Sequence, residues 1–75
     1  MDLVPLFIPS LLELLRQAES SKGTALTENE VYRIRDSATT VMVSEDVFND
    51  TTLTRGFADI DPRDCWQEWK NARTN

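Results

Sequence analysis

The most apolar stretch of the chain is MDLVPLFIPSLLELL, residues 1–15, and the rest of the sequence is interpreted around it. Pro5 and Pro9 both suit the first turn of a helix, where the missing N–H costs nothing. The pattern predicts either one helix over Pro5–Ser21 or a helix that begins afresh at Pro9–Ser10. Gly23 then follows as a stop signal.

On a helix, this stretch would be apolar on more than one side. Its apolar residues are Leu3, Val4, Leu6, Phe7, Ile8, Leu11, Leu12, Leu14, Leu15 and Ala18. Leu11 and Leu15 would share one face, whereas Leu6, Phe7 and Leu14 would point away from it. A helix that is apolar nearly all round needs burial on several sides, and the other short segments of so small a chain cover only one. The apolar residues that the rest of the chain cannot cover therefore predict an interaction surface.

A second helix is predicted from Thr27, because Thr27 and Glu30 form the pattern of a capping box. Val31, Ile34, Ala38, Val41 and Met42 follow at helical spacing. The helix is expected to end near Met42, since the β-branched residues of Thr39–Val43 weaken helix propensity. In this interpretation the run lies within a helical period and no strand pattern competes.

Two further helix starts are visible. Ser44 is a good N-cap followed by two acidic residues, and Gly56 is a plausible end for that short helix. Asp61 suits the N-cap and Pro62 the first position of the last helix. The inner face of that helix is predicted to carry Cys65, Trp66, Trp69 and Ala72.

Together these signals predict an all-α fold, a small bundle of three to four short helices in a single domain over residues 1–75. A chain of 75 residues with 40% apolar and 28% charged residues has the composition of a soluble globular protein. Neither a membrane-spanning helix nor a secretory signal is expected, because prolines and Glu13 interrupt the first apolar run. The lone Cys65 favours a reducing, cytoplasmic location.

Composition also narrows the classes of function. The net charge of −5 and the scattered basic residues argue against nucleic acid as a partner. The chain has no histidine and one cysteine, so it lacks the commonest general base and any multi-cysteine metal site. We therefore expect no enzyme activity, no metal and no cofactor.

The segment RGFADIDPRDCWQEW, residues 55–69, is the one other region dense in reactive side chains. An EF-hand counted from Asp59 fails, because Asp64 and Lys70 stand where Gly and Glu are needed. Asp59 and Asp61 could form a carboxylate pair for acid–base catalysis, but the sequence offers no activated nucleophile for such a pair to act on. The structural interpretation is that Asp61 caps the last helix and Arg55 pairs with Asp59 or Asp61. The recognition alternative is a hot spot made of Phe57, Asp59, Asp61 and Trp66.

In size, acidity and helical pattern, with tryptophans in its last helix, the chain resembles the small bacterial immunity proteins that neutralise toxic nucleases. In the colicin-immunity group the recognition element is a tyrosine-rich turn between acidic residues. The corresponding segment here is Ala58–Pro62, ADIDP, which has no tyrosine. The resemblance therefore assigns no residue a role.

Two functions follow as hypotheses. The first is a non-enzymatic protein–protein interaction module that associates through the apolar N-terminal helix, most simply as a homodimer. The second is a small acidic inhibitor of the immunity type that neutralises a basic partner such as a nuclease toxin. The predicted interface residues are Leu3, Leu6, Phe7, Leu11, Leu14, Phe57, Asp59, Asp61 and Trp66.

Overall fold

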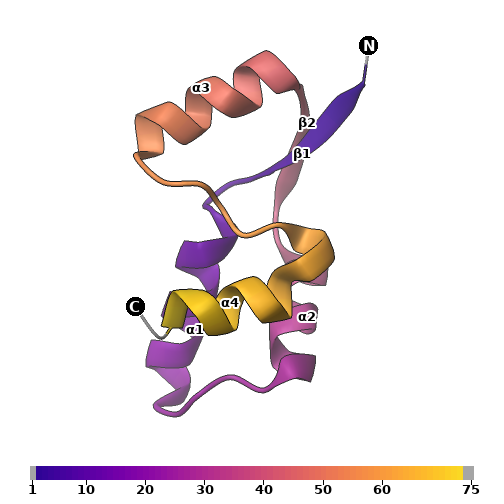
Figure 1. Cartoon of the computed structure of the whole chain (residues 1–75). Helices are drawn as coiled ribbons and strands as arrows, with labels where there is room; N and C mark the ends of the chain where they lie inside the picture. The colour runs from indigo at the N-terminus through magenta and orange to yellow at the C-terminus, as the bar shows by residue number, and fades with distance from the viewer. Residues whose placement is uncertain (1, 74–75) are drawn as a thin grey trace.

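A computed structural model describes residues 2–73. Its elements are β1 (Leu3–Phe7), α1 (Leu11–Lys22), α2 (Glu28–Ser37), β2 (Thr40–Ser44), α3 (Glu45–Arg55), a 3-10 turn (Pro62–Asp64) and α4 (Cys65–Arg73). The molecule is elongated, with extents of 40 × 23 × 19 Å. In Figure 1, α1, α2 and α4 gather at one end, while the two strands and α3 form the other.

The two strands make the predicted all-α bundle wrong. β1 and β2 pair antiparallel as a two-stranded sheet, with Leu3 opposite Ser44 and Phe7 opposite Thr40. One of the two predicted starts of the first helix includes residues 5–7 of β1, and the predicted second helix includes residues 40–42 of β2. The sequences LVPLF and TVMVS lack the alternation of a half-buried strand. Each is extended because the other, far along the chain, supplies its hydrogen bonds.

Of the two helix boundaries next to the strands, one agrees with a predicted start and the other lies earlier than predicted. α1 begins afresh after Ser10, whose hydroxyl accepts a hydrogen bond from the Glu13 N–H. This is the second of the two predicted starts, and the turn before it contains a cis Ile8–Pro9 bond. α2 ends at Ser37 rather than near Met42.

The other predicted caps are confirmed. Thr27 and Glu30 form the capping box of α2, Ser44 caps α3, and Asp61 caps the 3-10 turn that leads into α4. Gly23 and Gly56 adopt the left-handed conformation at the ends of α1 and α3, each with φ of 81°. A left-handed residue ends a helix without strain only where no Cβ is present.

The main hydrophobic core lies among α1, α2 and α4. It consists of Phe7, Leu11, Leu15, Leu26, Val31, Ile60, Cys65 and Trp69. α4 lies across α1 and α2 in Figure 1, and its Trp69 is buried in this core. Phe7, the last residue of β1, links the strands to this core, whereas α3 contributes no buried residue at all.

Candidate interaction surface

The pattern of hydrogen bonds between the strands shows which backbone groups face outwards. The Ile8 N–H donates to the Thr39 carbonyl at 3.0 Å, one step beyond the paired strands. In an antiparallel pair, hydrogen-bonded and non-hydrogen-bonded residue pairs alternate. The pairs Leu6–Val41 and Val4–Val43 are therefore the bonded ones. The backbone groups of residues 3, 5 and 7 on β1, and of 40, 42 and 44 on β2, point away from the partner strand.

The outer edge of β1 is blocked. Pro5 faces that edge and has no N–H to donate. The carbonyl of Phe7 accepts a hydrogen bond from the Arg55 guanidinium at 2.7 Å. Proline and an edge-covering side chain are two of the devices by which proteins prevent a further strand from adding to a sheet.

The outer edge of β2 is open. Within residues 2–73, no hydrogen bond occupies the outward N–H and C=O groups of Thr40 and Met42. The side chains of Val41 and Met42 are 42% and 57% exposed. Thr40–Ser44 contains no charged residue, no proline and no glycine. An uncharged, exposed strand of this kind is a template for pairing with another polypeptide.

Arg55 and Asp59 hold the blocked edge in place. The two side chains are largely buried and lie 3.9 Å apart. The Asp59 carboxylate accepts hydrogen bonds from the N–H groups of Leu11 and Leu12, at 2.8 and 2.9 Å. A carboxylate at the first turn of a helix satisfies free amides and faces the positive end of the helix dipole. The pair therefore joins α3, β1 and α1 to the connector, residues 56–61. The sequence predicted that Arg55 pairs with Asp59 or Asp61, and the structure shows the pairing with Asp59.

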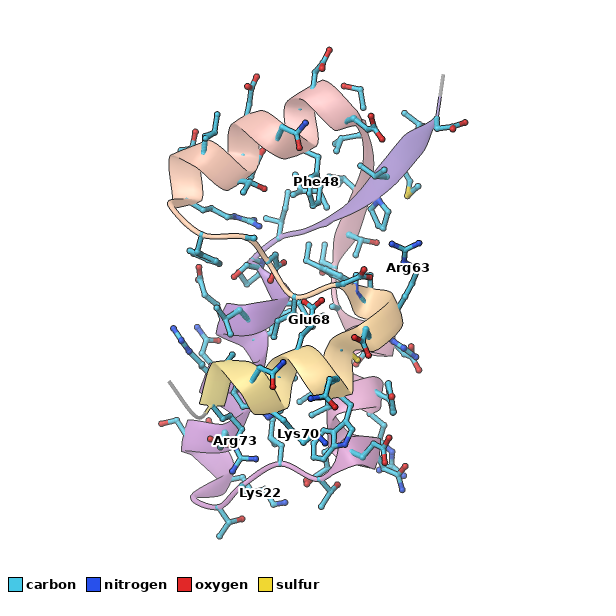
Figure 2. The ribbon with its side chains drawn as sticks, viewed as in Figure 1. Lys22, Phe48, Arg63, Glu68, Lys70 and Arg73 are labelled. Carbon is cyan, nitrogen blue, oxygen red and sulfur yellow. The ribbon has the colours of Figure 1, made fainter. Side chains whose placement is uncertain are left out.

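A groove of about 610 Å³ runs between this connector and the underside of α3. Its apolar lining comes from Val4, Pro5, Phe7, Phe48, Ile60 and Pro62. Figure 2 shows Phe48 on the side of α3 that faces the strands. Glu45, Asn49, Asp59, Asp61 and Arg63 provide the polar lining.

The predicted interface residues do not form one surface. Leu6, Phe7 and Leu11 are buried within the chain itself, and only Leu3, at 55% exposure, is open to solvent. Leu14, Phe57 and Trp66 are half-buried. The expectation of an N-terminal helix that is apolar on several sides is therefore corrected: residues 3–7 form β1 instead, in which Leu6 and Phe7 are buried, whereas Leu3 and, beyond the strand, Ile8 stay exposed.

The acidic residues of the connector serve local structure. The Asp59 carboxylate accepts hydrogen bonds from the first amides of α1. The Asp61 carboxylate accepts a hydrogen bond from the Arg63 backbone N–H at 2.9 Å and forms an ion pair with the Arg63 guanidinium at 3.2 Å. The Arg63 guanidinium holds the pKa of the Asp61 carboxyl below its usual value. Figure 2 shows Arg63 beside the turn that leads into α4, with its side chain on the outside of the molecule. No group of three acidic or cysteine side chains in the described part of the chain is arranged to hold a metal ion.

A cation–π contact and a buried thiol lie at the end of the molecule formed by α1, α2 and α4. The Lys70 ammonium lies 5.3 Å from the Trp66 ring centre, so both side chains are engaged with each other. Cys65 is buried and free. Burial raises the pKa of its thiol, because the thiolate would lose its hydration. Such a thiol is a packing residue rather than a nucleophile.

Val41 and Met42 are the surface residues that sequence reasoning missed. Both had been placed on the inner stripe of the second helix. The available signal was the run Thr39–Val43, whose β-branched residues favour a strand. The helical spacing of Val31–Ala38 continues into Thr39–Val43, and periodicity alone does not distinguish the end of a helix from a short apolar strand.

Within residues 2–73, the helices are all too short or too polar to cross a bilayer. No protein-family model matches the chain, and comparisons with curated proteins and with solved structures gave no match either.

Proposed function

We propose that the protein is a non-enzymatic interaction module that binds another polypeptide by strand addition along β2. The observation that carries the proposal is the uncharged outer edge of Thr40–Ser44, where no hydrogen bond within residues 2–73 occupies the outward groups of Thr40 and Met42. Strand addition uses main-chain hydrogen bonds for affinity and alternate side chains for specificity. Met42 on one face and Val41 on the other would supply those side-chain contacts.

The asymmetry of the sheet supports this choice of edge. On β1, Pro5 and the Arg55–Phe7 hydrogen bond prevent pairing, whereas β2 has neither device. A bound strand at β2 would create a three-stranded sheet, and three strands with a covered face are more stable than an isolated pair. The proposal includes a cytoplasmic location, which the single unpaired thiol of Cys65 favours.

Site-specific photo-crosslinking tests the proposal without assuming which polypeptide binds. A photoreactive amino acid replaces Met42 in one variant and Leu53, 79% exposed on α3, in the matched control. In producing cells and in the purified protein, we expect an adduct to a polypeptide from position 42 and none above background from position 53.

A second substitution, Thr40→Pro, is then added to the position-42 variant. It removes an outward N–H of β2 while the pairing to β1 remains, and we expect it to abolish the adduct. Circular dichroism checks that the helices persist. Equal adduct yields from positions 42 and 53, or an adduct insensitive to Thr40→Pro in a folded protein, would contradict strand addition.

A second candidate function is the acidic inhibitor, and the outer surface of α3 favours it. Glu45, Asp46 and Asp50 are exposed on that helix, while its one basic residue, Arg55, turns inwards to Phe7 and Asp59. An acidic surface without cations attracts a basic partner. Under this alternative, Asp46→Lys together with Asp50→Lys would abolish binding to the basic partner, whereas Met42→Lys would leave that binding unchanged.

A further inference from the structure

We propose that the strand bound at β2 is β2 of a second copy of this chain. The two copies pair antiparallel around a two-fold axis at Met42, giving a continuous four-stranded sheet in the order β1–β2–β2–β1. This inference rests on the proposed function and specifies its partner.

The register follows from the outward groups. In an antiparallel pairing, residues that face the partner must lie opposite one another, so residues 40, 42 and 44 must meet residues 40, 42 and 44 of the second copy. Only one register uses the whole of Thr40–Ser44 in both chains. It places Met42 opposite Met42 of the second copy and Thr40 opposite Ser44. Because the pairing relates each residue to its equivalent, the strand is complementary to itself and the assembly closes at two copies.

Side chains on both faces of the new sheet would then find apolar neighbours. Met42 already lies opposite Pro5 within one chain, so Pro5, Met42 and their equivalents form one row across the four strands. On the other face, Val41 lies opposite Val43 of the second copy in a non-hydrogen-bonded pair, where side chains approach most closely. The exposed apolar side chains of β2, those of Val41 and Met42, are therefore among the ones that the pairing covers.

Charge selects a second copy of this strand over a charged partner segment. Thr40–Ser44 is neutral, so two copies bring no like charges together at the axis, although the whole chain carries −5. The nearest acidic residues, Glu45 and Asp46, belong to the first turn of α3, where the helix dipole stabilises them. A neutral strip on an acidic chain lets two copies meet there without direct repulsion.

The cross-linking of single cysteines tests the axis. Hydrogen-bonded residue pairs in antiparallel strands have Cα atoms about 5.5 Å apart, within the range of a disulfide. Met42→Cys is therefore expected to form a covalent dimer rapidly on mild oxidation. Leu53→Cys, which is more exposed but lies on α3, is the control, and the buried Cys65 stays in both. Faster dimerisation of Leu53→Cys than of Met42→Cys would overturn the axis.

Sedimentation of the native chain over micromolar to millimolar concentrations gives the second measurement. We expect a mass that rises to twice that of one chain, and a chain that stays monomeric when Met42→Lys places two ammonium groups at the axis. A native chain that is monomeric throughout overturns the inference. The photo-adduct formed at position 42 distinguishes a failure of the second-copy inference from a failure of strand addition itself. An adduct with the mass of a different protein retains strand addition and rejects the second copy, and no adduct at all rejects both.

Discussion

Asp59 joins α1, α3 and the segment before the 3-10 turn through one side chain. Its carboxylate lies at the start of α1, close to the Arg55 side chain of α3, and also accepts from the N–H of Ile60 at 2.8 Å. Three backbone amides and one guanidinium thus converge on a single, largely buried group. A buried acceptor with several donors is costly to remove, because each donor left behind has lost its water as well.

We expect Asp59→Ala to lower the free energy of unfolding by about 2 kcal/mol. Urea denaturation followed by tryptophan fluorescence measures it. Asp50→Ala, an exposed aspartate on α3, is the matched control, and we expect it to change stability by no more than about 0.5 kcal/mol. Equal effects of the two substitutions would show that Asp59 has no special structural role.

Glu30 gives a pH-dependent contribution to stability. Its carboxylate bonds to the Lys22 ammonium and accepts from the Thr27 N–H at 2.9 Å. The hydrogen bond from Lys22, followed by that from Thr27, lowers the pKa of Glu30 from 4.5 to about 2. Because the pKa is lower in the folded chain, the contribution is complete above pH 4.5 and is lost as the pH falls towards 2.

We therefore expect the melting temperature of the native chain to exceed that of Glu30→Gln above pH 4.5, and the difference to shrink between pH 4.5 and about 2. Glu28→Gln is the control, because Glu28 shares the first turn of α2 but has no ion pair within residues 2–73. Thermal scans at several pH values measure the difference. If the difference in melting temperature between the native chain and Glu30→Gln stays constant down to the lowest pH, the contribution does not come from the ionised Glu30 carboxylate.

At the scale of elements, α3 is the least firmly held helix. It buries no residue, and three threonine hydroxyls on it donate to carbonyls one turn back, those of Val47, Phe48 and Asp50. Such bonds offer little gain to a helix and accompany low propensity. Its attachment therefore depends on the half-buried Phe48 over the strands and on Arg55. Elements with few buried contacts open at low free-energy cost.

We expect the amides of α3 to exchange with deuterium faster than those of α1 and α4. Phe48→Ala should accelerate exchange in α3 by a further tenfold or so, equivalent to about 1.4 kcal/mol for half the burial of a phenylalanine. Leu53→Ala, at 79% exposure on the same helix, should leave the rate nearly unchanged. If Phe48→Ala accelerates exchange equally in α4, α3 is not a separate unit.

At the scale of the whole molecule, charge and shape determine how copies meet. The core lies at the end formed by α1, α2 and α4, and the open strand lies towards the other end of a 40 Å body. Two chains that pair through β2 are each at −5, so long-range repulsion opposes an association that short-range contacts favour. Added salt screens the long-range repulsion between the two chains and leaves the short-range contacts largely intact.

We accordingly expect added salt to strengthen association between copies, measured by sedimentation at constant protein concentration over increasing sodium chloride. An acidic inhibitor bound to a basic partner shows the opposite trend, since its attraction is screened. A dimer that weakens as salt rises would contradict pairing through the neutral strand.

Much of the local architecture could be predicted from residues close together in the chain. The caps at Thr27, Ser44 and Asp61 and the stops at Gly23 and Gly56 were confirmed. Each depends on a side chain bonding an amide two or three positions away, or on the freedom of glycine at positive φ. Such interactions need no knowledge of the remaining fold. The pairing of Arg55 with Asp59, four residues apart, was predictable for the same reason.

The two strands and the open edge were decided by the tertiary structure alone. LVPLF and TVMVS carry no local signal strong enough to outweigh helical spacing, and each becomes a strand only by exchanging hydrogen bonds with the other. That pairing buries Leu6 and Phe7 and turns Val41 and Met42 to solvent. The sequence by itself determined where the helices are capped, since capping is a local hydrogen-bond problem. Which apolar residues are left exposed is a property of the assembled sheet, because exposure depends on chain segments that meet only in three dimensions.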